Sequence, residues 1–186
     1  MRNPMVFNQV THYSPEGEKM VKVLDDLSFE IMPGEVKWVS EKLGKNKKVV
    51  VSLLLKEEKP IIGEINTGPN GAGYISYSFS DYYHPLNAGD NFKIVYLLNG
   101  VLLKDVDKTI DDDIGDWFPK KVMDMKPDDM EETEKVMFAF AMVRGRQLDP
   151  ILFDLSALPV TNEEKEQLVK FSEQYADRYS VGILLI

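Results

Sequence analysis

The chain contains no cysteine and only two histidines. Without cysteine it can hold neither a disulfide framework nor a thiolate metal site. His12 and His84 lie far apart in the sequence and lack acids at ligand spacing, so we expect no metal site. The absence of a disulfide framework favours a cytoplasmic location.

Positive charge is also scarce, because 22 lysine and arginine residues face 31 aspartate and glutamate residues, which gives a net charge of -9. This excess opposes electrostatic capture by nucleic acid or by anionic lipid. A run of about 18 apolar residues is missing, and residues 1–10 lack the apolar stretch of a signal peptide. We therefore expect no binding to nucleic acid and no direct insertion into a membrane.

What is present is a chain of 186 residues with 44% hydrophobic content, which is enough for one buried core. Apolar patterns predict strands at residues 6–10, 23–32 and 35–40, a helix at 48–55, and short strands at 151–153 and 181–186. Helical periodicity predicts further helices at 91–103, 135–146 and 162–179. Because strands and helices alternate, the expected fold class is α/β, with a parallel sheet flanked by helices.

Two segments are interpreted as loops from their composition. Residues 68–73 are rich in glycine and predict a tight hairpin turn between strands at 63–66 and 74–79. Their glycine pattern mimics a phosphate-binding loop, but Tyr74 stands where such a loop requires lysine. The acidic run at 111–116 lacks the glycine and final glutamate of a calcium loop, and it predicts a solvated loop that leads into a helix.

Several segments occur in a familiar order. Residues 23–31 are followed by Pro33-Gly34-Glu35, then by a Lys-Pro-x-x-Gly segment at 59–63, and later by residues 83–92 and 138–142. Over nearly the whole chain this order resembles the ATP-binding subunits of ABC transporters, most closely the branch that exports capsular polysaccharide, teichoic acid and O-antigen. The last two segments carry the similarity to that branch.

The resemblance implies a single P-loop NTPase-like ABC nucleotide-binding domain over residues 1–186. Its expected parts are a mixed sheet flanked by helices, an antiparallel β subdomain, and a helical subdomain at about residues 86–146. The family's switch histidine would come just past Ile186, so the resemblance also implies that the domain is truncated at its C-terminus.

In the register set by this resemblance, the phosphate-binding loop is degenerate. A working loop reads Gly-x-x-x-x-Gly-Lys-Ser/Thr, because its amides surround the phosphates, its lysine reaches the terminal ones and its hydroxyl binds Mg²⁺. The corresponding residues here are Glu41, Asn46, Lys47 and Lys48, with Gly44 as the one inner glycine. Because a carboxylate repels phosphate and lysine cannot bind a cation, we favour a solvated lysine-rich turn over a phosphate site.

Four further positions extend this interpretation. Tyr13 falls where the family places an aromatic that stacks on adenine, although packing against the sheet is an equally good interpretation. Asp154 either matches the family's Mg²⁺-linked aspartate or caps a turn, and Leu155 replaces the general-base glutamate. The signature motif aligns with Glu131 and Glu132, which repel phosphate but favour a helix start. The vestigial nucleotide-binding set is therefore Tyr13, Gly44, Lys47, Lys48 and Asp154, and the degenerate positions are Glu41, Asn46, Leu155, Glu131 and Glu132.

Together these residues favour a catalytically silent, ABC ATPase-like subunit that acts as an interaction or regulatory module in envelope polysaccharide export. We expect no catalytic residue and no cofactor. The implied partners are an ABC permease and an intact ATPase subunit, in a homo- or heterodimer at the inner face of the cell membrane. The alternative is a divergent subunit that binds and hydrolyses ATP with Mg²⁺ through Lys47, Asp154 and Tyr13.

Overall fold

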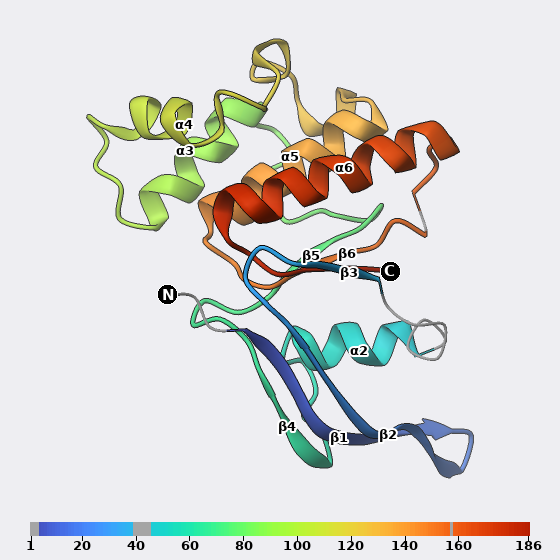
Figure 1. The fold of residues 1–186 in the computed structure, drawn as a ribbon. Coiled ribbons are helices and arrows are strands. Elements are labelled where there is room, and N and C mark those ends of the chain that lie inside the picture. Colours follow the sequence, from blue (N-terminus) through green and yellow to red (C-terminus); the bar gives the residue numbers. More distant parts are fainter. Residues whose placement is uncertain (1–3, 39–45, 157) are drawn as a thin grey trace. The chain divides into compact units, whose positions relative to one another are not determined.

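The computed structural model describes residues 4–38, 46–156 and 158–186, which fall into two compact units (Figure 1). The first unit is built from the chain up to Tyr74, from Leu148–Ser156 and from Lys165–Ile186. The second is built from Ile75–Gln147 and from a short segment that ends at Glu164. The predicted loop positions Glu41 and Gly44 lie outside the described residues.

The first unit contains a three-stranded antiparallel sheet, sheet A. Its strands are β1 (Met5–Glu16), β2 (Lys19–Ile31) and β4 (Ile62–Asn66), in the order β2-β1-β4. The β1–β2 hairpin pairs Met5 with Ile31 at one end and Glu16 with Lys19 at the other. Both strands run further toward the hairpin tip than predicted, because backbone hydrogen bonds continue into a region whose side chains are exposed.

Sheet B also belongs mainly to the first unit. Its order is β3 (Val36–Trp38), β7 (Ile183–Leu185), β6 (Ile151–Phe153) and β5 (Gly73–Ile75), and β7 runs parallel to both β3 and β6. Every residue of β6 and β7 is buried, as expected for parallel strands that are covered on both faces. The predicted parallel sheet is confirmed for these three strands.

Two helices of the first unit flank sheet B (Figure 1). One is α2 (Lys47–Leu54), and the other is the part of α6 (Asn162–Tyr179) that begins at Lys165. The buried face of α2 shares one core with both sheets, in which Leu54 packs with Phe7 of β1, Leu152 of β6 and Leu184 of β7. This packing explains why three consecutive valines form a helix, because burial of an apolar face outweighs the weak helix preference of β-branched residues.

The hairpin predicted around residues 68–73 is wrong, because β4 belongs to sheet A and β5 to sheet B. The glycine-rich segment instead pairs with the loop before β6. The amide of Gly68 donates to the carbonyl of Asp149 at 2.8 Å, and that of Gly73 donates to the carbonyl of Pro150 at 2.8 Å. A Cβ on Gly68 would lie 2.5 Å from the carbonyl oxygen of Asp149, so glycine is needed here for a close approach of two loops.

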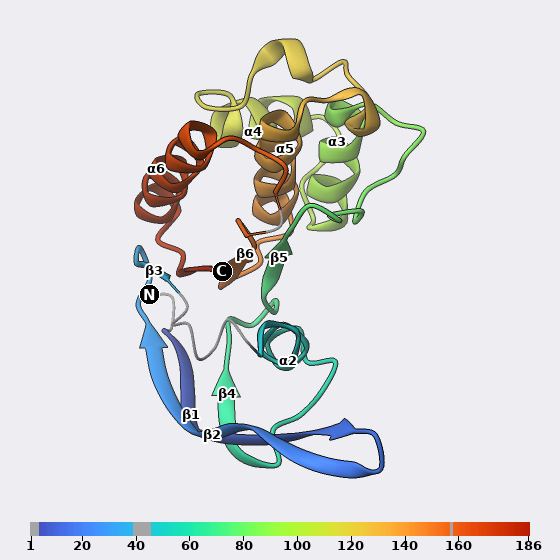
Figure 2. The ribbon, with the colours of Figure 1, turned by 90° about the vertical axis from the view of Figure 1, so that its right-hand side faces the viewer.

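The second unit is helical and contains α3 (Ala88–Leu98), α4 (Val106–Ile114), α5 (Glu132–Gly145) and two single-turn 3-10 helices, Lys120–Val122 and Pro127–Asp129 (Figure 2). Its core contains a group of aromatic rings. The ring centroid of Phe92 of α3 lies 5.0 Å from that of Phe118, edge to face, and 5.4 Å from that of Phe138 of α5. Helix α5 is buried on nearly all faces, as its continuous apolar sequence predicts.

The acidic run begins inside α4 and does not form the predicted loop and helix start. Buried Val106, Ile110 and Ile114 recur every fourth residue and provide the helix with its apolar face. Asp113 accepts hydrogen bonds from Tyr96 Oη at 2.7 Å and from Arg144 Nε at 2.8 Å. The loop prediction was wrong because three adjacent aspartates dominate the local composition. The apolar residues at every fourth position were therefore overlooked.

Gly63 offers a test of the sheet A register. Its φ is +81°, and a Cβ at this position would lie 2.4 Å from the carbonyl oxygens of both Asn8 and Gln9. We expect Gly63→Ala to destabilise the protein by about 3 kcal/mol, from left-handed backbone strain and overpacking together. The matched control is Gly71→Ala, at a φ of +87° with no atom within 4 Å, which should cost only about 1 kcal/mol. Urea unfolding of both variants measures the difference, and equal losses would contradict the described register.

Candidate functional site

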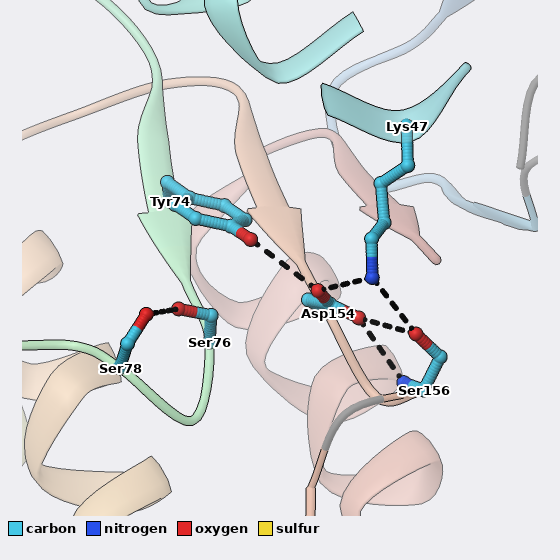
Figure 3. A network of polar contacts seen from close by, with 6 residues as sticks. All are labelled: Lys47, Tyr74, Ser76, Ser78, Asp154 and Ser156. Atoms are coloured by element: carbon cyan, nitrogen blue, oxygen red, sulfur yellow. Dashed lines mark hydrogen bonds and ion pairs between the residues drawn. The ribbon is translucent and has the colours of Figure 1, made fainter. Parts of the chain in front are cut away.

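Four side chains of the first unit come from three separate stretches of the sequence (Figure 3). Lys47 is the first residue of α2, Tyr74 lies in β5, and Asp154 directly follows β6, with Ser156 two residues later. Because β6 is a buried parallel strand, its C-terminal end is the place where polar side chains of such sheets gather. The structure thus brings together two predicted residues, Lys47 and Asp154, and two that were not predicted.

The Asp154 carboxylate is the centre of this group. Its Oδ2 atom accepts hydrogen bonds from Lys47 Nζ at 2.7 Å and from Tyr74 Oη at 3.3 Å. Its Oδ1 atom accepts from the Ser156 backbone amide at 3.2 Å and from Ser156 Oγ at 2.7 Å. Asp154 therefore caps the following turn, which is one of the two interpretations left open by the sequence, and it also binds a lysine.

Lys47 is held by two acceptors. In addition to Asp154, its ammonium group donates to Ser156 Oγ at 3.1 Å. The Asp154 side chain is only 3% exposed, whereas that of Lys47 is 28% exposed. The pair is thus a buried anion with a cation that reaches it from the surface, a geometry in which the buried charge depends on its partner.

Burial and hydrogen bonding act on Asp154 in opposite directions. Burial alone raises the pKa of the Asp154 carboxyl group, but the hydrogen bond from Lys47, those from Ser156, and the charge of Lys47 together outweigh it. The net effect lowers the pKa of Asp154 below its usual value of 3.8. At neutral pH the carboxylate is ionised and paired.

The start of α2 differs from that of a working phosphate-binding helix. Asn46 precedes the helix, and its side-chain Nδ2 donates to the carbonyl of Val23 in β2 at 2.6 Å without capping the helix. Lys48 is exposed on the first turn. In the register that the resemblance implies, this is the position expected to supply a hydroxyl ligand for Mg²⁺, and here it carries a second cation.

The remaining predicted residues of the first unit do not join the pair. Tyr13 is half-buried in β1, opposite Lys22 of β2, and among the described residues no hydrogen bond, ion pair or ring contact connects it to Lys47 or Asp154. Leu155 is 3% exposed and belongs to the core. The residue next to the aspartate is therefore packed as an apolar side chain.

Glu131 and Glu132 lie in the second unit, at the start of α5. The Glu131 backbone amide donates to Glu134 Oε2 at 3.1 Å, and Lys135 Nζ donates to Glu132 Oε1 at 2.9 Å. Glu134 also pairs with Lys121 at 2.8 Å. That hydrogen bond is the main reason why the pKa of Glu134 lies below its usual value, even though partial burial opposes the shift. This helix N-terminus is thus occupied by carboxylates of its own chain.

Sequence reasoning missed Tyr74 and Ser156. A signal for Ser156 exists, because an aspartate followed two residues later by serine is typical of a side-chain-capped turn. No comparable signal exists for Tyr74, whose hydroxyl reaches Asp154 only because β5 joins sheet B beside β6. The incorrect hairpin prediction excluded that contact.

No family model and no curated protein matches this sequence. Among solved structures, the chain is similar to cbiO1 from Clostridium perfringens, part of the ABC transporter complex cbiONQ, with a TM-score of 0.80 and 13% identity over 97% of this chain and 76% of that chain. It is also similar to the dimeric bacterial ABC transporter cassette MJ0796, with a TM-score of 0.70 and 15% identity over 97% of this chain and 86% of that chain.

A third similar structure is an ATP-binding subunit of an ABC transporter, with a TM-score of 0.70 and 13% identity over 98% of this chain and 78% of that chain. The expected fold is therefore confirmed, and the chain has the fold of ABC transporter ATP-binding cassettes. Within the described residues, no helix combines the length and apolarity needed to cross a membrane.

The buried pair predicts a pH-dependent contribution to stability. Lys47→Met leaves the Asp154 carboxylate without its cation, and we expect a loss of about 2 kcal/mol at pH 7, reduced from the fully buried case by the exposure of Lys47. Because the pKa of Asp154 is lowered on folding, this contribution is present above 3.8 and is lost as the pH falls through the lower pKa of the folded state.

The control for this experiment is Lys48→Met, which removes the same charge from an exposed neighbouring position and should change stability by less than about 0.5 kcal/mol. Denaturant titrations of the three proteins across the acidic range measure both effects. Equal losses in the two variants, or a Lys47 effect that grows on acidification, would refute the role assigned to the pair.

Proposed function

We propose that this protein is a catalytically silent ABC-type cassette, which works by binding partner proteins without turning over ATP. The observation that carries the proposal is the engagement of the Lys47 ammonium group by Asp154 and Ser156, next to a buried Leu155. In the family that the sequence resembles, this lysine reaches the terminal phosphates, the aspartate is linked to Mg²⁺, and the next residue is the general base.

The contacts of Lys47 oppose the capture of a triphosphate. For its ammonium to reach a phosphate, the carboxylate of Asp154, with 3% exposure, must lose its only described cationic partner. Separating this pair costs about 2 kcal/mol, less than for a fully buried pair because Lys47 is 28% exposed, unless a metal ion replaces the lysine. Lys48 weakens that replacement, because a second ammonium group stands where a hydroxyl ligand is needed.

Hydrolysis also lacks a base. Leu155 is 3% exposed and packs in the core, so it offers neither a carboxylate nor an exposed position from which to orient water. The nearby hydroxyl of Ser156 is engaged, since it donates to Asp154 and accepts from Lys47. Lys47 is thus engaged elsewhere, and neither Leu155 nor Ser156 is suited to activate water.

The start of α5 indicates that this chain is also poorly suited to contact ATP held by a partner cassette. In the resembled family, this helix N-terminus contacts the γ-phosphate held by the opposite subunit. Here Glu131, Glu132 and Glu134 gather at that position, and Glu134 already accepts a backbone hydrogen bond that caps the helix. A phosphate brought by a partner would meet carboxylates, so the proposed role for this surface is contact with protein.

The proposed setting is export of an envelope polysaccharide, through a complex with an ABC permease and an intact ATPase subunit at the inner face of the cell membrane. This part of the proposal is supported by the resemblance of residues 83–92 and 138–142 to polysaccharide exporters. It is also supported by the solved structures of similar fold, one of which is part of an ABC transporter complex and another of which is a dimeric cassette.

One observation favours a second candidate, a divergent cassette that still binds ATP. Lys47 and Asp154, which the resemblance assigns to nucleotide and Mg²⁺ binding, lie 2.7 Å apart between the start of α2 and the end of β6. If Mg²⁺ displaced the ammonium group from Asp154, both side chains would be available to a triphosphate. Direct titration with nucleotide separates the two candidates.

We expect calorimetric titration with Mg-ATP at millimolar concentration to show no saturable binding, because the lysine and aspartate satisfy each other. The matched comparison is Lys47→Ala, which should give the same baseline and no change in phosphate release. Saturable binding or ATP hydrolysis that Lys47→Ala abolishes would establish the second candidate in place of the first.

The partner role is tested by co-expression with the permease and the ATPase encoded nearest to this gene. We expect the three proteins to co-purify, with an ATPase activity that survives Lys47→Ala in this chain and disappears when the phosphate-loop lysine of the intact ATPase is replaced. A complex that still assembles but loses its activity on Lys47→Ala would rule out a silent subunit, and failure of the unchanged proteins to co-purify would rule out the proposed setting.

A further inference from the structure

The helical second unit contains a cavity of about 190 Å³ that the proposed function does not use. Its walls come from α3, from α4 and from the segment that follows α4. This segment is fixed against the start of α3, because the amides of Ala88 and Gly89 donate to the carbonyls of Met125 and Met123 at 2.9 Å each. Backbone hydrogen bonds therefore hold two of the segments that line the cavity against each other.

The floor of the cavity is apolar. Ile110, Ile114 and Phe118 are each 3% exposed or less, and Met123 contributes a flexible thioether that adapts to ring-shaped ligands. A dry cavity of about 150 Å³ is sufficient to hold a benzene ring. The space here therefore fits one aromatic ring or branched aliphatic group with a short polar extension, and it is too small for a nucleotide.

The rim carries four charged residues of two kinds. Lys93 and Asp107 neutralise each other across 3.0 Å. Lys120 and Asp111 are different, because neither side chain makes a hydrogen bond or an ion pair anywhere in the described part of the chain. The cavity thus presents one ammonium group and one carboxylate that remain available to a ligand.

Gly115 and Asp111 lie next to each other in the lining of the cavity. A Cβ at Gly115, which lines the same cavity, would lie 2.7 Å from Asp111 Oδ1. Any larger residue at this position would collide with the carboxylate and with the Asp111 carbonyl oxygen at 2.4 Å. Glycine at position 115 therefore avoids a collision with the Asp111 carboxylate.

We propose that this cavity binds a free α-amino acid with a large apolar side chain. The side chain occupies the apolar floor, the α-carboxylate pairs with Lys120, and the α-ammonium pairs with Asp111. A zwitterion matches a rim with one available charge of each sign, whereas a simple amine or a simple acid leaves one of the two charges without a partner. The site lies wholly within the second unit and shares no residue with the group around Asp154.

The test uses L-phenylalanine with three analogues that each remove part of it: 3-phenylpropionate lacks the ammonium group, phenethylamine lacks the carboxylate, and toluene lacks both. Calorimetry on the full chain should rank phenylalanine as the tightest ligand. Lys120→Met should weaken phenylalanine binding about fivefold without weakening phenethylamine, and Asp111→Asn should weaken phenylalanine about fivefold without weakening phenylpropionate.

Matched controls are Lys126→Met and Asp124→Asn, which make the same charge changes at exposed positions outside the cavity and should leave phenylalanine binding unchanged. The proposal is overturned if phenylalanine shows no saturable binding, if toluene or either single-charge analogue binds as tightly, or if the control variants reduce affinity equally. Both test positions are on the surface, so a melting temperature near that of the wild type verifies that the variants fold.

Discussion

The structure of the candidate site depends on one constraint: the carboxylate of Asp154 is almost completely buried and must be paired. Its 3% exposure excludes hydration, and four hydrogen bonds from Lys47, Tyr74 and Ser156 take the place of water. These bonds connect the start of α2, the edge strand β5 and the turn after β6. A single charge therefore fixes the positions of three elements at the C-terminal end of sheet B.

The same constraint limits what the site can do. A lysine that compensates a buried carboxylate is a structural cation, and its release for phosphate binding must be matched by another positive charge. In the register that the resemblance implies, Lys48 stands at the position of a metal-binding hydroxyl and Leu155 at that of the general base, and the proposed function rests on both assignments. Under the proposed function, Lys47 and Asp154 stabilise the protein and do not bind nucleotide.

The sequence predicted those elements whose signal is local and strong. Residues 151–153 and 162–179 match β6 and α6 to the residue, because a continuous apolar run identifies a buried strand and an amphipathic period identifies a helix. Long-range partners were not predictable. The glycines at 68–73 predicted a local turn, but in the structure they allow this segment to pack closely against the distant loop at Asp149. Tyr74 contacts Asp154 only because of this packing.

The fold survives with little sequence identity to its structural neighbours, at 13–15%, because it is specified by apolar positions in strands and helices. The chemistry of the site depends on a few individual side chains, and these decide the central claim. A crystal structure of the protein after soaking with Mg-ATP provides the most direct measurement. Our account predicts that Lys47 remains on Asp154 with no triphosphate beside it, and magnesium and triphosphate seated between these two residues would contradict it.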